Sequence, residues 1–294
     1  MRAISGRLIE RLAETGRELT LLDGRGVFMG RVVGPTSGNV LIRAAQHEAS
    51  RGDGALRIAR NVVLAKIQNQ RRLLVRRARD VRTGGKARVN EAAKGLGECI
   101  QAAAAAQTID ELRGHEGDAA RRYFGVFTEM VSAPGREFSL ESRERRPPRG
   151  RMNALLSFLY TMGTHDAVAA AEGVGLDPQV GYLHALRPGR PALALDLVEE
   201  VRAPLCDRLA ISMVNRRQIG AGDFEIIPGG AVYLSEQGRR IVSALWAQRR
   251  QMPVRHPLLR EDVPWGLVTH VQARLLARYL RGELSSYPAF LAPE

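Results

Sequence analysis

Apolar residues recur at helical spacing over most of the chain, and this pattern predicts a mainly α protein. In the clearest stretch, 55–84, Ile58, Val62, Ala65 and Leu73 fall on one helical face and cations cover the others. Pattern and end signals also predict further helices over 9–12, 89–112, 118–131, 149–172, 191–202, 235–250 and 264–282. We expect a break near Gly95 and Gly97 in the second of these, and Pro204 is expected to disturb the helix that begins at Pro191.

Two short strand pairs interrupt this helical pattern. Segment 18–34 predicts a hairpin around Asp23-Gly24, and 224–234 predicts another around Pro228-Gly229-Gly230. A lone hairpin is marginally stable. The first pair therefore indicates either packing against the helices or an N-terminal domain that is incomplete.

These patterns divide the chain into two predicted domains. We expect a truncated, β-rich N-terminal domain over 1–45 and a large helical domain over 46–294 that contains one short hairpin. A linker is expected at 82–85 and a polar loop at 134–148.

Composition narrows the class of protein. Of 294 residues, 45% are hydrophobic, which suits a packed core and excludes a disordered chain. Two cysteines provide no disulfide framework, so a reducing compartment is expected. Since no apolar run approaches the roughly 20 residues that span a bilayer, we predict a cytoplasmic protein with no membrane segment.

The charge points to a polyanionic partner. Lys and Arg number 44 against 31 Asp and Glu, a net charge of +13, and only three of the cations are lysine. Guanidinium groups match phosphate oxygens, and with 5% aromatic residues the pattern favours backbone contacts to duplex DNA over base stacking. The alternatives are an acidic membrane surface, solvated helix faces or a biased genome composition. The candidate DNA-binding residues crowd the helix at 55–84 and the loop before 149: Arg71, Arg72, Arg76, Arg77, Arg143, Arg145 and Arg146.

Four side chains form a candidate site for chemistry. Glu116 lies between glycines at an expected helix start, where a capping acid is the alternative, and His184 follows an apolar stretch, where a core or surface histidine is the alternative. Asp196 and Glu199 share one helical face, with Glu200 as a competitor, although solvent-facing acids also fit this pattern. Such an oxygen and nitrogen set suits Mg²⁺ or Mn²⁺ rather than a closed zinc site.

The blocks around these residues resemble a known family. LRGHEGDAARRYF, RRPPRGRMNALLSFLYT, GLDPQVGYLH and ALALDLVEEVRAPLCDRL resemble, in order, blocks of the CRISPR-associated integrase of spacer acquisition, the Cas-one family, most closely the type I-C version. The resemblance extends from about residue 12 to the C-terminus. Since family members carry more β-strands before ISGRLIERLAETG, the chain resembles a form with a shortened N-terminal domain.

The resemblance implies roles for individual residues. Glu116, His184 and Asp196 match the family's catalytic metal ligands, and Glu199 matches the acid beside them as a direct or water-mediated ligand. Asn153 and Tyr160 match positions that support the site in the family, through packing or contact with the DNA end. On this basis 46–294 is expected to be a metal-dependent catalytic domain.

The implied activity is that of a DNA endonuclease and integrase dependent on Mg²⁺ or Mn²⁺. In it, the 3′-hydroxyl of a captured DNA fragment attacks a phosphodiester of a CRISPR repeat, and with water as nucleophile the same site cleaves DNA. The implied partners are double-stranded DNA, a second copy of the chain, a Cas-two dimer and a Cas-four-type nuclease. The alternatives are a non-catalytic DNA-binding subunit of the same complex, an unrelated metal-dependent phosphohydrolase and a purely structural helical protein.

Overall fold

Helices form most of the described chain, which confirms the predicted mainly α fold. The computed structural model describes residues 4–15, 19–22, 28–32, 40–81, 83–132, 137–144 and 146–293. Its α-helices are α1 (Gly6–Glu14), α2 (Val40–Ala49), α3 (Asp53–Arg77), α4 (Thr83–Ala105), α5 (Ile109–Gly125), α6 (Arg151–Gly173), α7 (Ala192–Val201), α8 (Arg208–Asn215), α9 (Glu236–Gln251) and α10 (Trp265–Leu280). Its other helical segments are η1 (Phe127–Met130), η2 (Arg202–Asp207) and η3 (Ala221–Asp223). Among the described residues, no helix is both long and apolar enough to cross a membrane.

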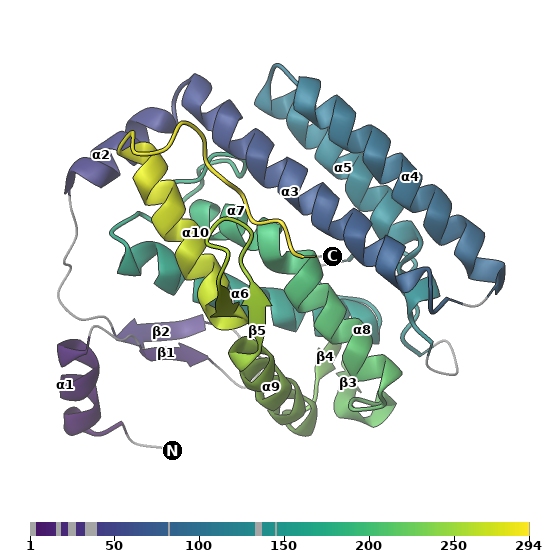
Figure 1. The fold of residues 1–294 in the computed structure, drawn as a ribbon. Helices are drawn as coiled ribbons and strands as arrows, with labels where there is room; N and C mark the ends of the chain where they lie inside the picture. Colours follow the sequence, from purple (N-terminus) through teal and green to yellow (C-terminus); the bar gives the residue numbers. More distant parts are fainter. Residues whose placement is uncertain are drawn as a thin grey trace.

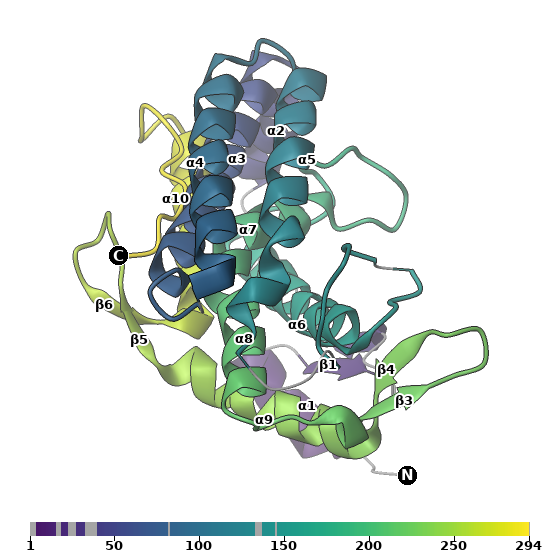
Figure 2. The ribbon, with the colours of Figure 1, turned by 90° about the vertical axis from the view of Figure 1, so that its right-hand side faces the viewer.

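Three helices, α3, α4 and α5, run side by side and each packs against the other two as a bundle (Figure 2). The apolar period predicted for the first of them is confirmed, since Ile58, Val62 and Leu73 are buried. The break expected in α4 is wrong, because α4 continues through both glycines. A Cβ on Gly95 would lie 2.5 Å from Nη1 of Arg122, so this glycine makes room for a neighbouring helix instead of ending its own.

The starts of α4 and α5 differ from the sequence prediction. The linker expected at 82–85 is wrong for residues 83–85, which begin α4, whereas Arg82 lies outside the described residues. The helix expected from 118 begins at Ile109, where the Thr108 side chain accepts a hydrogen bond from the Glu111 N–H. Glu116 therefore lies in the middle of α5 and is not a capping acid.

Helix α7 lies at the centre of the molecule, packed against α3, α6 and α10 (Figure 1). All its residues except Leu195 are buried, including three acids. The predicted helices at 149–172, 235–250 and 264–282 are confirmed as α6, α9 and α10. The disturbance expected at Pro204 is confirmed as the π-helical segment η2, after which the unpredicted α8 follows.

Among the described residues, the strands form three separate antiparallel pairs. The predicted hairpins are confirmed as β1 (Leu19–Leu22) with β2 (Phe28–Val32), and β3 (Phe224–Ile226) with β4 (Val232–Leu234). The turn predicted at Asp23-Gly24 lies outside the described residues.

The expectation of a single hairpin after residue 45 is wrong. Strands β5 (Pro253–Arg255) and β6 (Asp262–Pro264) form a second hairpin, in which Pro253 is aligned with Pro264. Proline at both strand ends hides this pair from a pattern search. The domain boundary predicted at 45 falls within α2, and the division into domains stays a prediction.

Candidate functional site

A buried cation lies between two acids where α3, α5 and α7 meet. Nζ of Lys66 on α3 contacts Oε1 of Glu116 on α5 and lies 2.8 Å from Oε2 of Glu199 on α7. The side chains of Lys66 and Glu199 are 5% and 4% exposed. Because water screens charges poorly at such a place, the ammonium group favours the ionised form of the Glu199 carboxylate and lowers its pKa.

The segment 181–184 brings the predicted histidine to the same place. Nδ1 of His184 lies 2.6 Å from Oδ1 of Asp196, and Nε2 lies 3.9 Å from Oε1 of Glu199. A carboxylate only accepts hydrogen bonds, so Nδ1 carries the proton and the lone pair of Nε2 is left free on the side of Glu199.

Asp196 holds this segment through its backbone. Its Oδ2 accepts from the N–H groups of Tyr182 at 2.6 Å and Leu183 at 3.0 Å, and its Oδ1 accepts from the N–H of His184 at 3.1 Å. A Cβ on Gly181 would lie 2.8 Å from Oδ2 of Asp196, so this close approach requires glycine. Both oxygens of Asp196 are thus used to orient His184 and its backbone.

A line of side chains supports Glu199 from the other side. Nη1 of Arg202 lies 2.7 Å from Oε1 of Glu199, and its guanidinium lies over the Tyr160 ring, 4.6 Å from the centroid. The Tyr160 hydroxyl donates to Oδ1 of Asp207 at 2.5 Å, and the Tyr123 hydroxyl donates to Oδ2 at 2.9 Å. Tyr160, predicted as a supporting residue, therefore contacts the site through Arg202.

Two adjacent buried acids have very different pKa values. Burial alone would raise the pKa of Glu199, but the positive charges of Arg202 and Lys66 hold it at about 2. Burial raises the pKa of Glu200 to about 7, although Tyr287, Phe290 and Gln272 donate hydrogen bonds to it. The structure thus places Glu199 beside Glu116 and His184. Glu200 faces residues 281–293, which follow α10 and are called the C-terminal segment below.

The donor set fits a divalent cation. Among the described residues, no group of three or more His, Cys, Asp and Glu side chains stands ready in a metal-holding arrangement. The Lys66 ammonium group lies between the carboxylates of Glu116 and Glu199. The place is therefore built for positive charge, and hard oxygen donors with one imidazole suit Mg²⁺ or Mn²⁺.

The predicted supporting residue Asn153 organises the loop before α6. Its Oδ1 accepts from Nη1 of Arg143 at 2.9 Å and from the N–H of Glu144, and its Nδ2 donates to the carbonyls of Ser142 and Arg149. The described part of the loop predicted at 134–148 contains no helix or strand, as expected. The three arginines predicted there differ: Arg143 also lies near the Tyr160 ring, Arg146 is exposed, and Arg145 lies outside the described residues.

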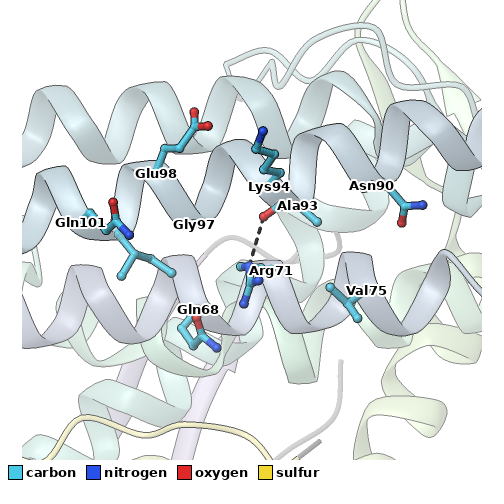
Figure 3. Close-up of a pocket in the computed structure, with 10 residues that line it drawn as sticks. Gln68, Arg71, Val75, Asn90, Ala93, Lys94, Gly97, Glu98 and Gln101 are labelled. Carbon is cyan, nitrogen blue, oxygen red and sulfur yellow. Dashed lines mark hydrogen bonds between the residues drawn. The ribbon is translucent and has the colours of Figure 1, made fainter.

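The arginines predicted for DNA on α3 also divide into two groups. Nε of Arg71 donates to the Ala93 carbonyl at 3.1 Å, where it lines an open cavity of about 620 Å³ between α3 and α4 (Figure 3). Arg72 donates to the Ala292 carbonyl, so both bind backbone of the fold. Arg76 is exposed, and Arg77 lies 3.6 Å from Asp80.

Sequence reasoning missed several cations that the fold brings together. Lys66 carried a signal, because it is a lysine one turn after Val62 on the apolar face of the helix, but Arg202 carried none. Burial and the charges of Arg208 and Arg76 lower the pKa of Arg249 to about 10, and the causes of this shift include no acid. These three arginines come from α3, α8 and α9, so no local pattern connects them.

Similarity to known proteins extends over almost the whole chain. A family model described as CRISPR associated protein Cas1 matches residues 2–248. A CRISPR-associated endonuclease Cas1 1 of Moorella thermoacetica is 48% identical over 97% of this chain and 83% of its own length. A CRISPR-associated exonuclease Cas4/endonuclease Cas1 fusion of Geobacter sulfurreducens is 37% identical over 93% of this chain and 49% of its own length.

Solved structures share the fold. A CAS1 protein from Thermotoga maritima matches with a TM-score of 0.79 at 25% identity, over 99% of this chain and 86% of that chain. A chain of a Cas6-RT-Cas1–Cas2 complex matches with a TM-score of 0.79 at 25% identity, over 99% of this chain and 31% of that chain.

Proposed function

This chain belongs to the Cas1 family of CRISPR-associated proteins, and on that premise we propose that it is a metal-dependent DNA endonuclease and integrase. The observation that carries the proposal is the convergence of Glu116, His184 and Glu199 on one buried place that already holds a cation. These three side chains would hold Mg²⁺ or Mn²⁺. The bound ion supplies Lewis-acid stabilisation to a scissile phosphodiester.

We propose for Asp196 a different role from the one expected of a ligand. Both its oxygens accept hydrogen bonds from residues 182–184. In the proposed site Asp196 fixes the tautomer and orientation of His184, while Glu199 takes the direct position. Arg202 keeps Glu199 ionised, and Lys66 occupies the carboxylates when no metal is bound.

The proposed reaction is a transesterification. The 3′-oxygen of a DNA fragment forms a bond to a repeat phosphorus, the bond from that phosphorus to the leaving 3′-oxygen breaks, and the proton passes to the leaving oxygen through solvent. With water as the nucleophile, the same displacement cleaves the strand. The contribution of the protein is positioning and fixed charge, because no high-energy cofactor is needed.

DNA contacts are proposed for a cluster of arginines on α3, α8 and α9 that have no ion pair with an acid among the described residues. Burial and the charge of Arg76 lower the pKa values of Arg208 and Arg249, and a phosphate backbone is the natural counter-charge for this cluster. Replacing Arg76 and Arg208 with serine should weaken duplex binding. The slope of log K against log salt concentration should become less steep by about one to two. The matched control replaces Arg121 and Arg122, both paired with Asp118, and should change the slope less.

The partners follow from relatives. One is a Cas4/Cas1 fusion, and a matching structure is a complex that contains Cas1 and Cas2. We propose that this chain acts in the cytoplasm as a homodimer with a Cas2 dimer and a Cas4-type nuclease, in a system of type I-C.

Strand transfer on branched DNA in Mn²⁺ tests the proposed activity. His184→Ala and Asp196→Ala should each lose at least about 100-fold, since one removes a ligand and the other its support. His47→Ala, an exposed histidine on α2, is the control and should match the parent. Near-parental activity of both site variants would overturn the ion site. A parent that binds DNA without any metal-dependent turnover would favour the non-catalytic subunit.

A further inference from the structure

The segment that carries His184 is held from two sides. Asp196 on α7 binds the N–H groups of residues 182–184. The carbonyl of Leu183 is bound from the opposite direction by Arg113 on α5, with Nε at 3.0 Å and Nη2 at 2.6 Å. Because Leu183 is 4% exposed, water is a poor replacement for these two bonds.

Arg113 also links the histidine to the other acidic ligand. It lies three residues before Glu116, so the two residues are neighbours on the surface of α5. Its Nη1 lies 2.9 Å from Oδ1 of Asp110, one turn earlier. The planar guanidinium is thus held at both edges, and it projects from the same helix as Glu116.

We propose that Arg113 is a positioning residue of the ion site, which fixes His184 relative to Glu116 through the Leu183 carbonyl. This inference rests on the proposed function. It assigns to α5 both an acidic ligand and the clamp that sets the histidine. Lysine cannot reproduce the clamp, because it lacks the planar fork that binds one carbonyl twice.

The direction in which metal affinity changes when Arg113 is replaced distinguishes a positioning role from a simple effect of its charge. A positive charge on Arg113 repels a divalent cation, so its removal alone tightens metal binding. Loss of the clamp weakens metal binding, because outer partners of ligands typically contribute about 10-fold to 100-fold to affinity. A substitution that keeps the charge and loses the fork therefore isolates the clamp.

Mn²⁺ binding without DNA, followed by electron paramagnetic resonance, tests the inference. Arg113→Lys should weaken Mn²⁺ binding by about 10-fold. Its bound Mn²⁺ should also show a weaker ¹⁴N coupling from the imidazole than the parent, a signature that a general loss of stability does not produce. Arg113→Met should also bind more weakly, and Arg121→Ala should match the parent, since Arg121 on the same helix is exposed and bonded to Asp118.

Two results would count against different claims. Unchanged Mn²⁺ affinity and ¹⁴N coupling in Arg113→Lys, with affinity lost in His184→Ala, overturn the positioning role. Parental affinity in His184→Ala overturns the ion site itself. If Arg113→Met fails to fold, Arg113→Lys still decides the question, because it retains the charge and most of the side chain.

Discussion

Glu199 and Glu200 are adjacent on α7, both are buried, and yet they belong to two different regions of the molecule. Glu199 faces the cations Lys66 and Arg202 and has a pKa of about 2. Glu200 faces the C-terminal segment, where its partners are the Tyr287 hydroxyl, the Phe290 N–H and the Gln272 amide, and its pKa is about 7.

The difference shows how one helix provides both chemistry and architecture. Successive helical residues are about 100° apart, so two neighbouring acids meet separate environments. Cations keep Glu199 charged, as its proposed role as a metal ligand requires, whereas Glu200 accepts hydrogen bonds from neutral donors and so anchors the end of the chain to the core. Burial is common to both, so the character of the partners decides the role.

The largest expected effect separates the two acids by activity. Glu199→Gln should reduce Mn²⁺-dependent strand cleavage by at least about 1000-fold, or about 4 kcal/mol in the barrier, because it removes a charged ligand. Glu200→Gln is its matched control, with the same chemical change one residue away, and should remain within about threefold of the parent. Equal losses in the two variants would contradict the division of roles.

A pH series sharpens the comparison with a third buried acid. Burial raises the pKa of Asp207 to about 6, against the hydroxyls of Tyr160 and Tyr123 and the charges of Arg202 and Arg143. This value exceeds the usual one of about 3.9, so the folded state holds the proton more tightly. The contribution of Asp207 to stability therefore falls as pH rises from about 4 through 6.

Urea unfolding of the parent and Asp207→Asn measures this effect, because other titrating groups cancel in the difference. The free energy of unfolding of the parent should fall relative to the variant by about 2 kcal/mol between pH 4 and pH 7. A difference that is constant with pH would show that Asp207 behaves like the ionised Glu199 and not like Glu200.

Much of the fold follows from the sequence, because local periodicity determines it. The apolar face with Ile58 and Val62 predicts α3, and Ser235 predicts the start of α9. The failures depend on distant partners. Gly95 lies within the continuous helix α4 and leaves room for the Arg122 side chain, and that contact is invisible in the local sequence.

The site was predicted as a set of residues, but not as an arrangement. Glu116, His184, Asp196 and Glu199 do lie together. The sequence did not show that both carboxylate oxygens of Asp196 accept hydrogen bonds from backbone N–H groups. It also did not show which acid faces which cation, since that depends on the packing of α3 against α7.

The smallest expected effect concerns the region around Glu200. Nδ2 of Asn69 donates to the carbonyls of Glu200 at 2.7 Å and Phe290 at 2.9 Å, and Oδ1 accepts from the Ala292 N–H at 2.9 Å. Asn69→Ala leaves these buried groups unpaired and should lower the free energy of unfolding by about 2 kcal/mol in a denaturant titration. The exposed Asn90 on α4 is the control, and its replacement by alanine should cost less than about 0.5 kcal/mol.

Mn²⁺ affinity of Asn69→Ala then decides whether the two regions are independent. The bonds of Asn69 lie on the side of α7 that faces the C-terminal segment, so the affinity should stay within about twofold of the parent. A loss of affinity that accompanies the loss of stability would mean that the C-terminal segment sets the position of Glu199 through α7. The two acids would then report one coupled region, and the contrast between them would be a matter of charge alone.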